Sequence, residues 1–210
     1  MQHTEPHIGS SALITIDTQN DFTLRGAPAE IPGTGTIIPN MVRLLQWYRN
    51  RSRPIVHIVR LYLPDGSNVD LCRKGKIEEG ARIVWPDSAG AELVDPLKSA
   101  SSLRLDADLL LGGGIQRWSD HEVIIYKPRW GAFSRTPLEN YLKGIGVDTL
   151  VFCGCNFPNC PRTSIYEASE RDFRLVLIED AVSGLYEKGA EEMRKIGVAV
   201  MTTESFLSQS

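Results

Sequence analysis

The 210-residue sequence has no excess of basic residues, because 23 Lys and Arg stand against 26 Asp and Glu and leave a net charge of −3. A protein that binds a nucleic acid backbone normally carries a clear surplus of Lys and Arg. This absence argues against a nucleic acid partner, and we expect a small molecule to be the ligand instead.

Long apolar runs are also missing. No stretch approaches the ~20 consecutive apolar residues that a membrane-spanning helix needs. The first residues, MQHTEPHIGSS, have neither the basic nor the apolar region of a secretion signal. We therefore expect a soluble, cytoplasmic protein without a membrane partner.

Cysteine and histidine are scarce. Three of the four cysteines lie within eight positions, a layout that suits a disulfide framework poorly (Cys72, Cys153, Cys155 and Cys160). The four histidines show no metal-ligand spacing (His3, His7, His57 and His121). We expect reduced thiols, no bound metal and no cofactor.

Short apolar runs of strand length are present at 12–16, 55–59, 123–126, 150–153, 175–178 and 198–201. Between them, apolar residues recur at helical spacing, for example Ile37, Met41, Leu44 and Tyr48. Continuous apolar strands that alternate with helices are typical of a parallel sheet covered on both faces. The sequence therefore predicts one domain over residues 1–210, with a three-layer, doubly wound, Rossmann-like α/β fold and a mostly parallel sheet of six strands.

The segment 61–114 interrupts this rhythm with many glycines and prolines and is long for a connection, so it is predicted to be a functional loop or a lid, with short helices near 92–98. Ligands of open α/β sheets bind beyond the carboxyl ends of the strands. Asp17, Arg60 and Lys127 each directly follow an apolar run. Taken alone, Asp17 would more often be a turn residue and Lys127 a solvated cation.

Cys160 is the strongest candidate for a catalytic residue. It follows the turn 154–159 and directly precedes Pro161 and a helical stretch, and proline is favoured as the first residue of a helix. Cys160 is therefore predicted to be the N-cap, where unpaired amides and the helix dipole lower the pKa of a thiol. The alternative is a small buried apolar residue, as free cysteines often are.

Three separated motifs make the resemblance to a known family specific. They are Asp17-x-Gln19-x-Asp21-Phe22, Lys127-x5-Phe133 and Gly154-x5-Cys160, and they span roughly residues 11–182 in this order. In these motifs the sequence resembles the isochorismatase-like cysteine hydrolase superfamily, which includes nicotinamidases, N-carbamoylsarcosine amidases and ureidoacrylate amidohydrolases. The resemblance also implies a homodimer or homotetramer.

The resemblance implies that Cys160 is the nucleophile, Asp17 the base that takes its proton, and Lys127 the cation that links the two. It further implies a cis peptide bond between Cys155 and Asn156, which would direct the amides of Asn156 and Cys160 at the substrate oxygen as an oxyanion hole. Independently of the family, a thiol needs a base or a cation to become a nucleophile, and acyl transfer needs donors where negative charge develops. The expected reaction is thiolate attack on a small amide, carbamoyl or ureido substrate, followed by hydrolysis of the thioester.

The sequence departs from the family pattern in ways that affect the substrate. Phe157 and Pro161 replace the Thr and Val of many members, and Val59-Arg60-Leu61-Tyr62 stands where nicotinamidases carry an Asp-x-His metal motif. We therefore disfavour nicotinamide. An arginine suits a carboxylate, and the residues predicted to line the pocket are Phe22, Arg60, Trp130 and Phe157. Weaker candidates are Tyr62, Asp70, Arg73 and Trp85.

Three alternatives remain open. An isochorismatase proper cleaves a vinyl ether on this fold and, by resemblance, does not use a nucleophilic cysteine. A thiol redox or metal module could use Cys153, Cys155 and Cys160, and a catalytically idle family member could act as a binding domain. Activity that is retained in a Cys160→Ala variant would favour the isochorismatase. Stoichiometric zinc or a reversible disulfide would favour the redox or metal module, and a trapped acyl adduct on Cys160 would exclude the idle member.

Overall fold

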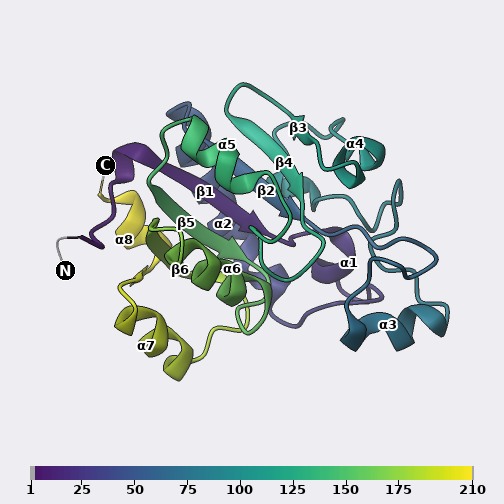
Figure 1. Ribbon diagram of the computed structural model, residues 1–210. Helices are drawn as coiled ribbons and strands as arrows, with labels where there is room; N and C mark the ends of the chain where they lie inside the picture. The colour runs from purple at the N-terminus through teal and green to yellow at the C-terminus, as the bar shows by residue number, and fades with distance from the viewer. Residues whose placement is uncertain (1–2, 210) are drawn as a thin grey trace.

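The computed structural model describes residues 3–209, and its centre is a seven-stranded sheet in the order β3-β4-β2-β1-β5-β6-β7 (Figure 1). Strand β3 pairs antiparallel with β4, and the other neighbouring strands pair in parallel. The strands are β1 Ser11–Ile16, β2 Ile55–Val59, β3 Ile115–Arg117, β4 Glu122–Tyr126, β5 Thr149–Gly154, β6 Arg174–Val182 and β7 Ala199–Met201.

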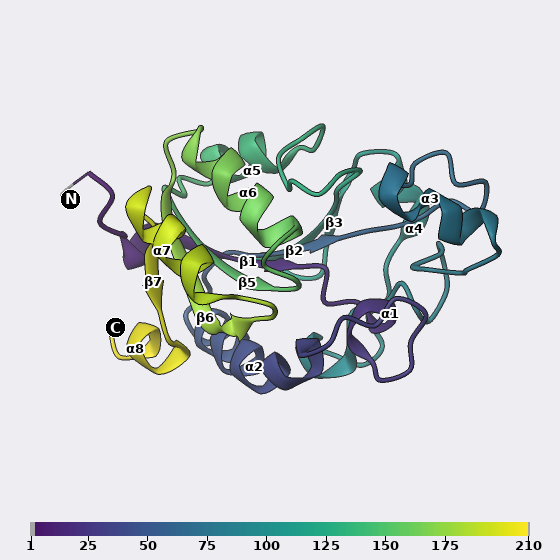
Figure 2. The same cartoon turned by 90° about the horizontal axis from the view of Figure 1, so that it is seen from below.

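Helices cover both faces of this sheet, so that α5 and α6 lie on one side and α2 and α8 on the other (Figure 2). The α-helices are α1 Asn20–Thr23, α2 Thr34–Asn50, α3 Leu71–Glu78, α4 Ala107–Leu111, α5 Leu138–Gly144, α6 Cys160–Ser169, α7 Glu187–Lys195 and α8 Thr203–Leu207, and short 3-10 helices span Ile8–Ser10 and Asp95–Leu97. Of the helices within residues 3–209, none combines the length and the apolar character needed to cross a bilayer.

The continuous apolar strands follow from this layering. Successive side chains of a strand point to opposite faces, so Ile14 packs into the core under α5 and α6 while its neighbour Leu13 packs into the core under α2. Both faces of β1 are therefore covered, and every residue of the strand is buried. The predicted three-layer, doubly wound, mostly parallel α/β fold is confirmed.

The number of strands is corrected from six to seven. The additional strand, β3, is only three residues long, lies at the sheet edge and is incompletely buried. Its sequence Ile-Gln-Arg follows Gly112-Gly113-Gly114 and offers no apolar run. Such a strand forms because β4 provides a free edge, which is information that the local sequence does not contain.

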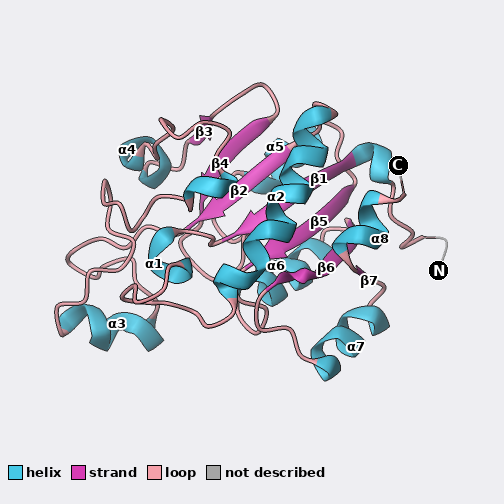
Figure 3. Ribbon diagram, turned by 180° about the vertical axis from the view of Figure 1, so that it is seen from behind, coloured by secondary structure: helices cyan, strands magenta, loops and turns pink. Residues whose placement is uncertain are grey.

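The segment 61–114 is a packed extension of the fold beyond the carboxyl ends of the strands, where α3 and α4 also lie (Figure 3). Its apolar side chains form a third buried cluster, which includes Leu61, Ile83, Leu93 and Leu110. The Asn20 amide donates to the Glu92 carbonyl at 2.8 Å, and this bond ties the segment to the chain that follows β1. The short helix predicted near 92–98 is present at Asp95–Leu97.

A buried chain of polar side chains crosses β1, β2 and β4. The imidazole of His57 lies between Thr15 Oγ1, 2.7 Å away, and Glu122 Oε1, 2.9 Å away. Arg49 of α2 donates to both carboxylate oxygens of Glu122, at 2.6 and 3.0 Å. Burial acts to raise the pKa of Glu122, but the hydrogen bonds from His57 and Arg49 outweigh it and lower this pKa to about 2. This cluster is structural, because it lies within the sheet and away from the carboxyl ends of the strands, where the cavity lies.

Candidate active site

Strands β1 and β5 are neighbours at the centre of the sheet, and the chain proceeds from β1 to β2 and β4 on one side and from β5 to β6 and β7 on the other. This reversal of strand order is a topological switch point, where the strand ends leave a crevice. Asp17 follows β1, and its amide donates to the Ile58 carbonyl at 2.9 Å. Lys127 follows β4, and its amide donates to the Val59 carbonyl at 3.0 Å. The sheet register therefore brings these two side chains to one edge.

Asp17 and Lys127 form a buried ion pair, with Lys127 Nζ 2.9 Å from Asp17 Oδ2. Lys127 has no exposed surface and Asp17 is only 4% exposed. Lys127 Nζ also donates to the carbonyl of Arg129 at 3.2 Å. The other carboxylate oxygen, Asp17 Oδ1, is buried and accepts no hydrogen bond of normal geometry from the residues within 3–209. One oxygen of Asp17 is thus held by the lysine, and the other is available to accept a proton.

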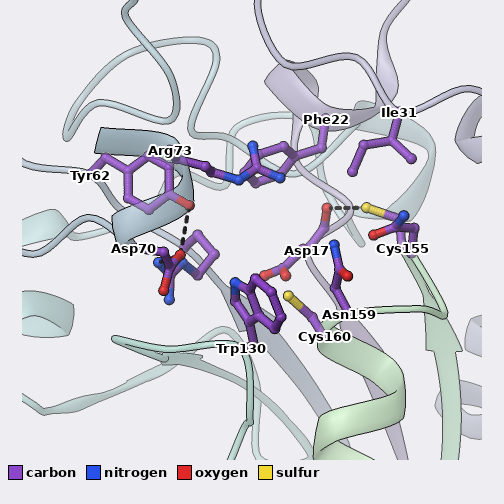
Figure 4. Close-up of a pocket in the computed structure, with 12 residues that line it drawn as sticks. Asp17, Phe22, Ile31, Tyr62, Asp70, Arg73, Trp130, Cys155, Asn159 and Cys160 are labelled. Carbon is purple, nitrogen blue, oxygen red and sulfur yellow. Dashed lines mark hydrogen bonds and ion pairs between the residues drawn. The ribbon is translucent and has the colours of Figure 1, made fainter. Parts of the chain in front are cut away.

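Cys160 is the first residue of α6, and Asn159 is the N-cap, so the predicted N-cap position is corrected by one residue. The thiol points toward the Asp17 carboxylate, beside the Trp130 ring (Figure 4). Burial raises the pKa of Cys160 to about 12, and the charge of Asp17 adds to this effect while Lys127 opposes it. The prediction of a lowered thiol pKa is therefore wrong. Desolvation and a neighbouring carboxylate outweigh the helix N-terminus, and the resting thiol holds its proton.

The turn before Cys160 is tied closely to β1. The Cys155 amide donates to the Ile16 carbonyl at 2.9 Å, and Cys155 Sγ lies 3.2 Å from the Asp17 carbonyl oxygen. A Cβ atom on Gly154, which has a φ of 114°, would lie 2.3 Å from the Ile16 carbonyl oxygen. This close approach requires glycine at position 154.

The peptide bond between Cys155 and Asn156 is cis, which agrees with the resemblance. Asn156 and Cys160 both line the cavity described below. Their backbone amides have no acceptor among the backbone hydrogen bonds of residues 3–209. Two unpaired donors beside a thiol are what an oxyanion hole requires.

These groups face a cavity of about 20 Å³. A space of this size holds about one water molecule. The lining residues are Asp17, Phe22, Ile31, Arg60, Tyr62, Asp70, Arg73, Trp130, Cys155, Asn156, Asn159 and Cys160 (Figure 4).

The cavity contains most of the residues predicted to contact the substrate. Phe22, Arg60 and Trp130 lie on its lining, whereas Phe157 does not. Phe157 is fully buried, and its ring meets the edge of the Tyr186 ring at a centroid distance of 5.7 Å. The prediction for Phe157 is corrected because its side chain packs into the core rather than into the cavity.

Arg60 is fixed at the cavity by an ion pair with Asp70, in which Nη2 lies 2.6 Å from Asp70 Oδ2. Its Nη1 donates to the Lys127 carbonyl at 3.2 Å, and its guanidinium lies 4.9 Å from the centroid of the Tyr62 ring. Asp70 and Tyr62 are two of the weaker candidates from the sequence. They reach the cavity because the segment 61–114 folds back over the strand ends.

The residues around this cavity do not fit a metal ion. Within residues 3–209, no group of three or more His, Cys, Asp or Glu side chains is arranged to hold one. The cationic Arg60 follows β2 at the cavity, and the carboxylate of Asp70 is already paired with it.

Two residues of the first motif position the cavity rather than line it. Gln19 accepts from the Arg60 amide at 2.7 Å and donates to the carbonyls of Arg60 and Ala91, at 2.7 and 2.6 Å. Asp21 accepts from the Val84 amide at 2.6 Å. Gln19 and Asp21 therefore fasten the segment 61–114 over the cavity, a role that local sequence did not reveal.

Comparison with known proteins identifies the family. A sequence model of the isochorismatase domain matches residues 11–104 and 109–205. A probable inactive nicotinamidase from Arabidopsis thaliana is 30% identical over 199 residues, which cover 92% of each protein. An N-carbamoylsarcosine amidase from Arthrobacter sp is 29% identical over 184 residues, which cover 84% of this chain and 62% of that protein.

Solved structures agree with this assignment. The crystal structure of an isochorismatase family protein from Desulfovibrio vulgaris superposes with a TM-score of 0.80 at 31% sequence identity, and it covers 94% of this chain and 96% of that one. With the domain match over most of the sequence, these findings show that the chain belongs to the isochorismatase family.

Proposed function

We propose that this chain is a cysteine hydrolase that cleaves the carbon–nitrogen bond of a small amide, carbamoyl or ureido substrate through a thioester intermediate. One observation carries the proposal. The thiol of Cys160 and the carboxylate of Asp17, which is paired with Lys127, face the same small cavity at the switch point of the sheet. A nucleophile, a base and a cation that orients the base are the minimum set for this chemistry.

The protonation states define the first step. Since the resting thiol is neutral and Asp17 is charged, the proton of Cys160 Sγ passes to Asp17 Oδ1 as the sulfur bonds to the substrate carbonyl carbon. The ammonium of Lys127, which donates to Asp17 and to the Arg129 carbonyl, also stabilises the developing negative charge. The oxygen of the tetrahedral intermediate is then stabilised by the amides of Asn156 and Cys160.

The remaining steps return the site to its starting state. The carbon–nitrogen bond breaks as Asp17 gives its proton to the leaving nitrogen, and ammonia or an amine departs. A water molecule then attacks the thioester carbonyl while Asp17 takes one of its protons. The carbon–sulfur bond breaks, the thiolate recovers its proton from Asp17, and the carboxylic or carbamic acid product leaves.

A catalytically idle protein that binds the same ligands is the second candidate. The 30% identity to a probable inactive nicotinamidase favours it, as does a cavity that holds about one water molecule. The similarity to an N-carbamoylsarcosine amidase favours the active enzyme. The intact set of Asp17, Lys127 and Cys160 is the reason that we prefer activity.

Release of ammonia from a panel of small primary amides, carbamates and ureido acids tests the proposal. The panel is assayed with the wild-type protein, Cys160→Ala and the matched control Cys72→Ser, which removes an exposed thiol. We expect turnover by the wild type and the control and none by Cys160→Ala. Equal turnover by Cys160→Ala would indicate chemistry without a nucleophilic cysteine, as in vinyl ether cleavage. Binding of panel members without turnover would indicate the idle protein.

A further inference from the structure

Four charged side chains line the cavity, and Lys127 pairs with one of them from outside the lining. Asp17 is paired with Lys127 at 2.9 Å and Arg60 with Asp70 at 2.6 Å. Arg73 is the fifth charged group, and its guanidinium makes no ion pair and no hydrogen bond with the residues of the described chain, 3–209. Counted together with Lys127, the charged groups at the cavity therefore carry one positive charge in surplus, and that charge is on Arg73.

Arg73 is held in place without using its donors. Its guanidinium carbon lies 5.4 Å from the centroid of the Phe22 ring, and the side chain is half-buried. An aromatic face attracts a guanidinium through its π electrons and leaves the N–H groups free. Figure 4 shows Arg73 and Phe22 together along one side of the cavity, with Cys160 and Trp130 along another. The free donors thus border the same space as the thiol.

Arg60, which the sequence analysis predicted to bind a substrate carboxylate, is not available for that role. It is only 2% exposed, and its two terminal nitrogens already donate to Asp70 and to the Lys127 carbonyl. A substrate carboxylate beside Arg60 would also meet the negative charge of Asp70. The carboxylate is therefore expected at the unpaired arginine, since a guanidinium fork binds a carboxylate through two parallel hydrogen bonds.

We propose that Arg73 binds a carboxylate of the substrate and thereby determines specificity at this site. The substrate is then a short anionic amide, carbamoyl or ureido acid. The substrate class rests on the proposed function. The anion subsite is inferred independently, from the charges at the cavity and the free donors of Arg73. The scissile carbonyl lies at Cys160, and a few carbon atoms separate it from the carboxylate at Arg73.

Matched substrate pairs test the subsite by turnover. Succinamate and succinamide both have a primary amide, but succinamate has a carboxylate where succinamide has a second amide. The second pair is 3-ureidopropanoate and its amide. We expect Arg73→Gln to lower kcat/KM for the anionic members by about 10- to 100-fold, the usual effect of losing charge-assisted hydrogen bonds. The neutral members should change little, and Arg73→Lys should keep part of the preference. Lys74→Gln removes a charge from the next residue of α3, which does not line the cavity, and should change neither.

Alkylation of Cys160 tests the subsite without any turnover. In a Cys72→Ser background, the labelling rates with iodoacetate and iodoacetamide are compared by peptide mass and normalised to glutathione. We expect Arg73→Gln to lower the iodoacetate to iodoacetamide ratio several-fold and Lys74→Gln to leave it unchanged. If the ratio depends on Arg73 while no amide releases ammonia, the proposed function fails and the anion subsite stands. A Cys160 that neither reagent labels, a ratio that does not depend on Arg73, or equal loss of turnover for anionic and neutral substrates overturns the inference.

Discussion

Replacing Asp17 by Asn should accelerate alkylation of Cys160 while it abolishes turnover. The substitution keeps the shape of the side chain and removes the charge that, together with burial, raises the pKa of the thiol. Lys127 remains buried beside the sulfur without its carboxylate partner. A buried cation next to a thiol favours the thiolate, so the pKa of Cys160 should fall in Asp17→Asn.

The size of the effect follows from the thiolate population. A thiol with a pKa of about 12 is ionised in about 3 molecules in 100,000 at pH 7.5. Each pKa unit of decrease raises the thiolate fraction about tenfold, but the weaker base is about threefold less nucleophilic, so the labelling rate gains roughly three- to fourfold. Loss of a neighbouring charge typically changes a pKa by about one to two units. We therefore expect roughly 3- to 15-fold faster labelling at pH 7.5.

The assay compares two rates for the same variants in the Cys72→Ser background. Labelling of Cys160 by iodoacetamide is followed from pH 6 to 10, and turnover is followed by ammonia release. Asp17→Asn should lose about 10²- to 10⁴-fold in turnover, because the base is gone. Asp65→Asn, which removes a charge from an exposed turn, should change neither rate. If labelling of Asp17→Asn slows as much as turnover, then Asp17 maintains a thiolate in the resting protein and the assignment of the proton to sulfur is wrong.

Three further substitutions have defined outcomes. Lys127→Met should destabilise the protein by about 3–5 kcal/mol in urea unfolding, because it leaves the carboxylate of Asp17 buried without a partner; a loss below about 1 kcal/mol would mean that water reaches the site. Gly154→Ala should cost more than about 2 kcal/mol through its clash with the β1 backbone, whereas Gly75→Ala on α3, where a Cβ meets nothing within 4 Å, should be neutral or slightly stabilising. The lowered pKa of Glu122 predicts stability that is complete above its ordinary pKa near 4.5 and is lost as the pH falls toward 2, by about 3 kcal/mol at most. In Glu122→Gln, the unfolding free energy should depend less on pH over that range. If its slope against pH is the same as in the wild type, other groups cause the acid sensitivity.

The sequence predicted the elements whose signal is local. Six apolar runs correspond to six of the strands, and the runs of the central strands are continuous because these strands are buried on both faces. Cys160 was recognised from a glycine-rich turn and a proline at the start of a helix, which are features of adjacent residues. The positions of Asp17 and Lys127 at strand ends followed from the same runs, and the register of the parallel sheet then brings them together.

What the sequence could not predict depends on contacts between distant segments. Arg73 reaches the cavity only because Gln19 and Asp21 fasten the segment 61–114 over the strand ends. Phe157 lies three residues before Cys160 in the sequence, but its side chain packs into the core against Tyr186. The pKa of Cys160 was expected to fall from its place at a helix N-terminus, and it rises because burial and a carboxylate outweigh that effect.

The central claim is that Cys160 forms a thioester with the substrate. The most direct test is to quench the reaction with acid during turnover of succinamate, digest the protein and measure the mass of the peptide that contains Cys160 by mass spectrometry. We predict that this peptide gains the mass of the acyl group, that hydroxylamine removes the added mass, and that the adduct is absent from Cys160→Ala. Turnover that proceeds at full rate in Cys160→Ala, or an acyl group found on another residue, would contradict the account.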